Sequence, residues 1–429
     1  MARLVHKFGG SSVGDIRKMR RCASRVAGVI ADGNEVAVVV SAMGDTTDEL
    51  IDLAGQVTSE PDRRELDALM ATGEQVSAAL FAMCLRELGL RGRSFTGAQA
   101  GIETDSRYGR ARIKAIDGTR LEEALAGGLV PVVAGFQGRA EEGGVATLGR
   151  GGSDTTAVAL GAALQVARHG GSCEIFTDVD GVFTADPRHV PDAVRLPRIS
   201  YGEMLELASL GAGVMHARAV VFGERHGVPI HVRHSQHHGV GTMIVKESPE
   251  MEDNVVVGCA LKTDLGRVTL RKLPATTGIQ ASLFDRLATG AVVVDDIIQT
   301  EFGDAASVAF TVEHGDLGAV KALANDVIGQ WGQGEVCIDV GLAKVSVVGV
   351  GMRSHAGVAS RMFRALSDVN IRIHNITTSE IKISCIIDRS EAERALRTVH
   401  EAFGLSELGN MAGIASGGNP SVQPSGTTG

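Results

Sequence analysis

The sequence predicts an α/β domain with a mostly parallel sheet, followed by two small α+β units. Up to residue 246, short apolar runs rich in β-branched residues alternate with stretches of helical character. The polar segment VKESPEMEDN follows and is typical of a linker, because it is charged and carries a proline. Beyond it the chain repeats itself, and from Gly278 onward the offset is a constant 79 residues.

In the first domain, strands are expected at the apolar runs and helices where apolar residues recur at helical spacing. The expected strands are 35–43, 129–136, 173–181 and 228–232, and the expected helical stretches include 154–164 and 202–227. Strands separated by helices pair in parallel, so helices should cover both faces of the sheet. Ligands of such sheets bind where the carboxyl ends of strands turn into helices.

The repeat defines the second half of the chain. Residues 267–270, 278–287, 291–296 and 299–301 correspond to 344–347, 357–366, 370–375 and 378–380. Each copy has the order strand, glycine-containing turn, helix, strand, strand, which is an α+β unit. We therefore expect domains at 1–247, 264–340 and 341–410, with a linker and connecting strand at 248–263 and a disordered tail at 411–429.

Composition narrows the class of function. With 429 residues, 44% of them apolar, the chain can bury several cores, and it has no run of 18 or more apolar residues that would span a membrane. A strand-like segment begins within three residues of the N-terminus, which leaves no room for a signal peptide, so we expect a cytoplasmic protein. The net charge of −9 and 3% aromatic content argue against nucleic-acid binding.

The cysteines and histidines do not predict a metal site. Cys22, Cys84, Cys173, Cys259, Cys337 and Cys385 lie far apart without a C-x-x-C pair, so reduced thiols are expected. His231, His234 and His237 are three residues apart, which on a helix would approximate ligand spacing. That segment begins as a strand and contains polar breakers, so a solvated loop is the preferred interpretation.

Four glycine-rich turns carry the chemistry: KFGGSSVGD, VVSAMGDTTDEL, TLGRGGSDTTA and TDVDGVFTADPR. In the first, Lys7 precedes its glycines, whereas the lysine of a P-loop follows them. The N–H groups of Gly9, Gly10 and Ser11 could hold a phosphate while the Lys7 ammonium neutralises a transferring phosphoryl group. An ordinary lysine above a tight turn is about equally probable from this motif alone.

The other turns offer groups that bind an amino acid. Arg150 can hold a carboxylate or phosphate with two parallel N–H bonds, and helix capping accounts for Ser153 or Asp154 but not for an arginine between glycines. Ser41 and Thr47 provide hydroxyls at a strand end, where a simple capping turn is the alternative. Glu74, in TGEQVS, would suit a substrate ammonium, and a solvated helix-start glutamate is the alternative.

Together these stretches, with FTGAQAG (95–101) and LGAGVMHARAV, resemble the aspartate kinases of the amino-acid kinase superfamily. The similarity extends from residue 2 to about 410 and includes the family's paired ACT regulatory domains. It implies an amino-acid kinase fold followed by two ferredoxin-like ACT domains. It also implies transfer of the ATP γ-phosphoryl group to the β-carboxylate of L-aspartate with Mg²⁺, at the start of lysine, threonine and methionine biosynthesis.

The resemblance also implies roles for individual residues. Lys7, Arg150 and Asp154 would be catalytic. ATP would be bound by Lys7, Phe8, Gly9, Gly10, Ser11, Thr177, Asp178, Asp180, Gly181, Val182, Phe183, Asp186 and Arg188. Aspartate would be bound by Ser41, Thr47, Glu74, Arg150, Gly151, Gly152, Ser153 and Asp154. No metal ligand is assigned by side chain.

The first repeat departs from the family pattern. Relatives that bind lysine or threonine usually carry an Asp-x-Pro-Gly type of loop and a Gln-Asn pair, where this chain has KLPATTGIQ and Gln299-Thr300. Effector binding would involve Thr276, Thr277, Gly278, Ile279, Gln299, Asn375, Ile376, Ser379, Glu380 and Ile381. Because both changes remove groups that would bind the effector, we expect feedback that is weak or answers to another effector.

Further expectations concern assembly and alternatives. ACT units usually pair through their sheets, so a homo-oligomer is expected, or an α₂β₂ assembly if translation also starts internally at Met251. A kinase for another acidic metabolite should alter Glu74 or Arg150, and a non-enzymatic sensor should lose Lys7 or Asp154. The sequence retains all four residues.

Overall fold

The computed structural model describes residues 1–211, 213–290 and 292–408, with the backbone alone at Phe302. These residues form two compact units. The first comprises Met1–Thr184, Val194–Asp253 and the described residues after Ser406, and the second comprises Ala185–Ala193 and Asn254–Ser406. The predicted domain boundaries stay predictions, and the predicted tail at 411–429 lies outside the described residues.

The first unit is built on an eight-stranded sheet in the order β10-β12-β11-β9-β1-β2-β6-β3. Its strands are β1 Arg3–Phe8, β2 Glu35–Val40, β3 Gly92–Phe95, β6 Val130–Ala134, β9 Cys173–Thr177, β10 Arg198–Ser200, β11 Ile230–His234 and β12 Thr242–Val245. Every pairing in this sheet is parallel except β11 with β12. The predicted mostly parallel sheet is confirmed.

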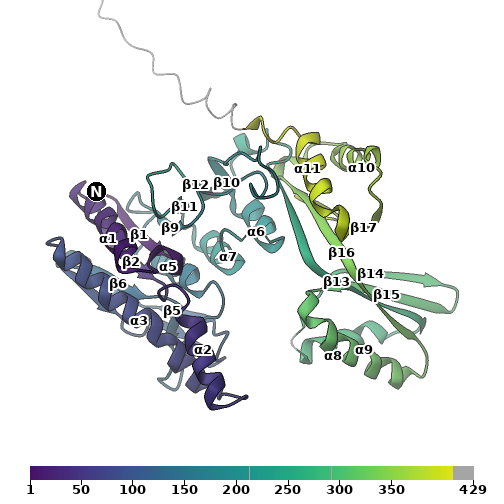
Figure 1. Ribbon diagram of the computed structural model, residues 1–429, viewed down its shortest axis with the longest axis horizontal. Coiled ribbons are helices and arrows are strands. Elements are labelled where there is room, and N and C mark those ends of the chain that lie inside the picture. Colours follow the sequence, from purple (N-terminus) through teal and green to yellow (C-terminus); the bar gives the residue numbers. More distant parts are fainter. Residues whose placement is uncertain (212, 291, 409–429) are drawn as a thin grey trace, which may run out of the picture. The chain divides into compact units, whose positions relative to one another are not determined.

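Helices lie on both faces of this sheet (Figure 1). They are α1 Ile16–Ala31, α2 Thr46–Val57, α3 Arg63–Glu87, α4 Thr119–Ala126, α5 Gly152–Ala163, α6 Tyr201–Ser209 and α7 Ala217–His226. On one face, α1 and α3 bury Met19, Phe81 and Leu85 against Phe8 and Val38. Since neighbouring residues of a strand point to opposite faces, Lys7 lies on the other face, which α5 covers.

A second sheet of the first unit was not predicted. It has four short strands in the order β5-β4-β7-β8: β4 Ile102–Thr104, β5 Ile113–Ile116, β7 Gln137–Arg139 and β8 Val145–Thr147. Three- and four-residue strands are too short to show a clear alternation of apolar and polar residues. This sheet precedes the TLGRGGSDTTA turn, because β8 ends at Thr147 and α5 begins at Gly152.

The helical stretch expected at 202–227 is wrong as a continuous element. It forms two helices, α6 and α7, which are separated by residues 210–216. Gly211 takes a φ of +97°, which ends the first helix, and the His216 ring nitrogen accepts the N–H of Arg218, which caps the second.

The second unit contains a six-stranded sheet in the order β14-β15-β13-β16-β18-β17. Its elements are β13 Gly258–Pro274, α8 Ile279–Thr289, β14 Asp295–Phe302, β15 Ala305–Val312, α9 Leu317–Trp331, β16 Glu335–Val348, α10 Val358–Asp368, β17 Ile373–Thr378, β18 Lys382–Asp388 and α11 Ala392–Ala402. The long strands β13 and β16 pair along most of their length (Figure 1).

The predicted internal repeat is confirmed in the backbone. The order strand, helix, strand, strand occurs twice, and a further helix follows each time. Helices α8 and α10 begin 79 residues apart, after Gly278 and Gly357, which both have a φ of +95°.

In the part of the chain that the structure describes, one helix, α3, is long and apolar enough by length and composition to cross a membrane. Half of its most apolar stretch is buried in the protein, and the helix also carries the buried carboxylates Asp67 and Glu74. It is a core helix of the first unit.

Candidate active site

Lys7 lies in the middle of the eight-stranded sheet, close to the carboxyl end of β1. It is paired in register with Val39 on one side and Ile175 on the other. The lysine is 9% exposed, and its Nζ lies 2.6 Å from Oδ1 of Asp154, in the first turn of α5. Two of the predicted catalytic residues therefore form a nearly buried ion pair.

The glycines after Lys7 bring two chain segments into contact. A Cβ on Gly10 would lie 2.9 Å from the carbonyl oxygen of Ala42, so only glycine allows this approach to the turn after β2. The N–H of Gly9 donates to the Phe176 carbonyl at 3.3 Å. The N–H of Gly9 is thus already used by the sheet, and the phosphate cradle expected from Gly9, Gly10 and Ser11 stays a prediction.

A cavity of about 450 Å³ opens above these turns. It is lined by Lys7, Gly10, Ser41, Ala42, Gly44, Thr47, Glu74, Phe136, Gly149, Arg150, Gly151, Gly152, Ser153 and Asp154. All eight residues predicted to bind aspartate line it, together with Lys7 and Gly10 from the predicted ATP site. Turns far apart in the sequence therefore form one site.

Glu74 faces the cavity from α3 and is 3% exposed. Its Oε1 accepts the N–H of Ala42 at 3.1 Å, while Oε2 is buried without a hydrogen-bond partner among the described residues. Burial raises the pKa of this carboxyl to about 7. The group is therefore poised to gain a cationic partner, which would favour its ionised form.

Arg150 lies in the turn between β8 and α5 and is exposed to the cavity. The next residue, Gly151, has a φ of +71°, and a Cβ there would come within 2.2 Å of the His216 side chain. Glycine is thus required by the backbone and by the close packing. At the start of α5, Ser153 is 8% exposed and lines the cavity.

The predicted nucleotide residues are only partly brought together. Thr177 follows Phe176, which pairs with Phe8, so it lies beside Gly9 at the same edge of the sheet. Asp178 and Asp180 are exposed, and the Asp180 carboxylate lies 2.9 Å from His237. None of these residues lines the cavity around Lys7.

The later residues of that turn have other surroundings. Val182 is 1% exposed and donates its N–H to Thr242, on which Gly181 also packs. Phe183 bridges to Arg195. Asp186 and Arg188 form an ion pair at 2.6 Å within the segment that is assigned to the second unit.

The histidine segment has partners in the first unit. His231 lies 3.4 Å from Glu174, and the rings of His234 and His237 stack with centroids 4.0 Å apart. No group of three or more metal-ligating side chains occurs in residues 1–211, 213–290 and 292–408.

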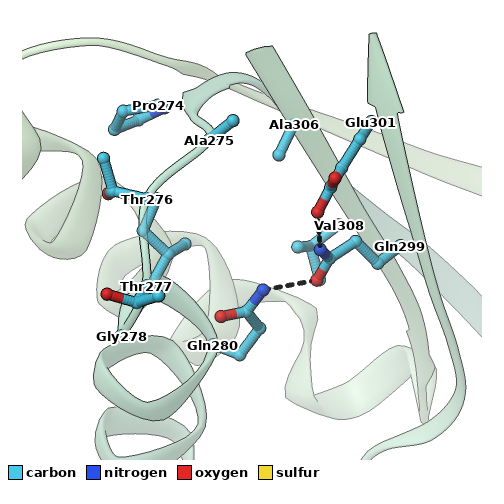
Figure 2. Close-up of a pocket in the computed structure, with 11 residues that line it drawn as sticks. Pro274, Ala275, Thr276, Thr277, Gly278, Gln280, Gln299, Glu301, Ala306 and Val308 are labelled. Carbon is cyan, nitrogen blue, oxygen red and sulfur yellow. Dashed lines mark hydrogen bonds between the residues drawn. The ribbon is translucent and has the colours of Figure 1, made fainter. Parts of the chain in front are cut away.

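The first repeat also contains a cavity, of about 290 Å³ (Figure 2). It lies between the loop that leads into α8 and the strands β14 and β15, and the predicted effector residues Thr276, Thr277, Gly278, Ile279 and Gln299 line it. Gln280 donates to Gln299 at 2.5 Å and Gln299 donates to Glu301 at 2.8 Å, as Figure 2 shows. Asn375, Ile376, Ser379, Glu380 and Ile381 do not line it.

Several lining residues escaped the prediction from sequence. Ala42 acts through its N–H, which no side-chain pattern signals. Phe136 lines the active-site cavity with a φ of +68°, which is rare for a bulky residue. Glu301 lines the cavity of the first repeat, and its place two residues after Gln299 on one strand could have signalled this.

Known proteins resemble this chain over most of its length. Residues 2–234 match the amino acid kinase family, and residues 345–403 match the ACT domain. The chain is 48% identical over 409 residues to an aspartokinase of Geobacillus stearothermophilus, covering 95% of this chain and 98% of that protein.

Two solved structures of E. coli aspartokinase III are also similar. The complex with aspartate and ADP has a TM-score of 0.78, and the complex with lysine and aspartate has 0.74. Both are 27% identical to this chain, and the matches cover 93% of this chain and 99% of that protein.

Proposed function

The chain belongs to the amino acid kinase family and, within it, to the aspartokinases, and from this premise we propose how its residues bind and phosphorylate aspartate. The enzyme is an ATP-dependent aspartate kinase. Glu74 binds the substrate ammonium, Arg150 binds a carboxylate, and Ser41 and Thr47 fix the orientation. Lys7 stabilises the transferring γ-phosphoryl group.

The observation that supports this assignment most strongly is the position of the charges around one cavity. Glu74 offers a buried carboxylate oxygen without a partner, and Arg150 offers an exposed guanidinium. Lys7, paired with Asp154, lines the same cavity. An acidic amino acid presents the complementary groups, an ammonium and two carboxylates.

In the reaction, an oxygen of the aspartate β-carboxylate attacks the γ-phosphorus in line. A new P–O bond forms while the bond to the β,γ-bridging oxygen breaks, and ADP leaves with that electron pair. The product is 4-phospho-L-aspartate. No general base is required, because a carboxylate is already ionised at pH 7. Lys7 and the N–H groups of Gly10 and Ser11, in the short helical turn Gly10–Ser12 after β1, contribute positioning and charge neutralisation.

Magnesium fits this site as an ion held mostly by the nucleotide. No group of three ligating side chains occurs in the described residues, and Mg²⁺ commonly binds through substrate phosphates, waters and one or two carboxylates. Asp154, which lines the cavity beside Lys7, is the carboxylate that would hold the ion. When bound, Mg²⁺ would neutralise charge that develops on the β- and γ-phosphates.

The experiment that tests the function is an ATP-dependent assay with L-aspartate, Mg²⁺ and hydroxylamine, which traps the acyl phosphate as a hydroxamate. We expect hydroxamate only when aspartate is present, and Lys7→Ala should lower the rate by about 100-fold or more, because a charge-stabilising group at the phosphoryl is lost. Lys114→Ala, at an exposed lysine on β5 that does not line the cavity, is the matched control and should keep the wild-type rate. Absence of hydroxamate with aspartate would overturn the assignment.

We also propose that lysine and threonine inhibit weakly. In the first repeat, the N–H of Ala275 already donates to Asp304 at 3.1 Å, and that of Thr276 donates to Pro274 at 2.9 Å. Fewer amides of the loop are then free for an effector carboxylate. Thr300, between Gln299 and Glu301, does not line the cavity. Inhibition at submillimolar lysine or threonine, singly or together, would refute this.

The remaining proposals concern assembly and location. We propose a homo-oligomer formed through the second unit, or an α₂β₂ assembly with a regulatory chain that starts at Met251. Size measurement by light scattering would contradict both if it gave a monomer at micromolar concentration. The six free cysteines suit a reducing compartment, and we propose the cytoplasm, which fractionation of the native host would test.

A further inference from the structure

Helix α3 carries two buried carboxylates, of which one lines the substrate cavity and the other does not. Asp67 is 1% exposed and Glu74 is 3% exposed. They are seven residues apart, which is about two turns and roughly 10 Å along the axis, so both lie on one face of the helix. Glu74 points into the active-site cavity, whereas Asp67 does not line it.

Asp67 holds the end of β8. Its Oδ2 accepts the N–H of Thr147 at 2.7 Å and the N–H of Gly109 at 2.9 Å. Its Oδ1 accepts the Thr147 hydroxyl at 2.8 Å. Thr147 is the last residue of β8 and stands three positions before Arg150. The carboxylate therefore fixes the point from which the Arg150 turn departs.

The residue after Thr147, Leu148, is held by α7 and by the backbone of Phe136. Arg218, on α7, donates to the Leu148 carbonyl and, at 2.9 Å, to the Ala111 carbonyl. The N–H of Leu148 donates to Phe136 at 2.8 Å. Residues 147 and 148 are thus fixed between α3 and α7, immediately before Gly149, which with Gly151 flanks Arg150 and packs closely against its neighbours.

We propose that Asp67 is a positioning residue which sets the distance between Glu74 and Arg150, and that this distance selects L-aspartate over the longer L-glutamate. The inference rests on the proposed roles of Glu74 and Arg150. Because one rigid helix carries Glu74 directly and fixes the Arg150 turn through Asp67, the two ends of the acceptor site keep a constant spacing. L-Glutamate carries its side-chain carboxylate one methylene further from its ammonium, so with Glu74 on the ammonium and Arg150 on the side-chain carboxylate it would not match that spacing.

A purely structural role for Asp67 would have different consequences. Loss of a buried acceptor for three donors would then lower stability and impair the aspartate and ATP sites alike. A positioning role affects the acceptor site selectively, because Lys7 and Gly10 are held by the central sheet and by the turn after β2. The ratio of the two KM values separates the two cases.

The test compares Asp67→Ala, Asp67→Asn and Thr147→Val in the full-length enzyme. Asp67→Ala should raise the KM for aspartate about tenfold or more, with the KM for ATP within about twofold of wild type. It should also reduce the preference for L-aspartate over L-glutamate, which one methylene can set at about 10- to 200-fold. Asp67→Asn should restore most of the wild-type behaviour, because an amide oxygen can still accept both N–H groups and the Thr147 hydroxyl can accept from the amide nitrogen.

Thr147→Val covers the case in which Asp67→Ala does not fold. It removes one hydroxyl donor and keeps both N–H bonds, so it should shift the aspartate KM in the same direction by a smaller factor. Asp117→Ala is the matched control, because Asp117 accepts the N–H and the hydroxyl of Thr119 at the start of α4 without holding β8. It should leave both KM values and the preference unchanged.

The outcomes separate this inference from the proposed function. Wild-type enzyme without aspartate-dependent hydroxamate would overturn the function itself. Active wild type with unchanged Asp67→Ala and Thr147→Val kinetics, or with parallel increases in both KM values, would overturn the positioning role alone. A change in substrate preference rescued by Asp67→Asn would support it.

Discussion

Glu74 combines burial with an incomplete set of partners. It receives one backbone hydrogen bond, from Ala42, and its second oxygen has none among the described residues. Desolvation therefore outweighs the hydrogen bond and raises the pKa to about 7. Because the folded-state pKa is above the ordinary value of 4.5, this group stabilises the fold below pH 4.5, and the contribution is lost as pH rises through 7. Bound aspartate should reverse that loss.

This pKa predicts how aspartate binding depends on pH. If only ionised Glu74 binds the substrate ammonium, the KM for aspartate should be about tenfold higher at pH 6 than at pH 8, because the ionised fraction changes by about that factor. Initial rates over this range, with ATP saturating, measure the dependence. Aspartate should also raise the melting temperature more at pH 8 than at pH 6.

Glu74→Gln is the control for this dependence. The amide has the same shape and does not titrate, so the KM for aspartate should be high and flat across the range. An equally steep pH dependence in this variant would show that another group is responsible.

At the scale of elements, helices α8 and α10 allow a controlled comparison. Each begins after a glycine with a φ of +95°, and an added Cβ would meet nothing within 4 Å at either Gly278 or Gly357. Substitution by alanine should then lower the free energy of unfolding only through backbone strain, by about 1 kcal/mol at each site. Only Gly278 lines the cavity of the first repeat.

We therefore predict equal losses of stability with unequal effects on regulation. Wild-type activity should fall less than twofold in 1 mM lysine or threonine, because the loop amides are partly occupied. At higher concentrations, the inhibitor concentration that halves the activity should change in Gly278→Ala and stay the same in Gly357→Ala. Urea unfolding and inhibitor titrations measure the two effects, and an equal shift in both variants would contradict the assignment of this cavity.

The sequence predicted the elements with a strong local signal. The parallel strands, the 79-residue repeat and the residues Lys7, Glu74, Arg150 and Asp154 all lie where their motifs indicated. Elements without such a signal were missed, including the four short strands before the Arg150 turn. Asp67 was missed for a related reason. Its partners are 42 and 80 residues away in the sequence, and no local pattern around a single helical aspartate predicts such distant contacts.

At the scale of the whole molecule, the two units have separate cores. One core of the second unit contains buried residues between Val268 and Val327, and another joins Leu265, Leu342 and Ile386. Met251 stands three residues before Asn254, where the second unit resumes. A chain that starts at Met251 would therefore contain the complete sheet of this unit and would lack Ala185–Ala193, which belongs to the same unit.

This arrangement predicts that a chain starting at Met251 folds on its own. Purified residues 251–429 should unfold in one cooperative thermal transition, followed by circular dichroism, because the sheet and its helices are retained. Expression from the native gene should then give two species, the smaller beginning at Met251. Met251→Leu removes the start codon with little change in side-chain volume, so it should abolish the small species and keep the kinase active. A single full-length species from the wild-type gene would contradict the internal start. A fragment that unfolds without a cooperative transition would show that Ala185–Ala193 is required for this unit to fold.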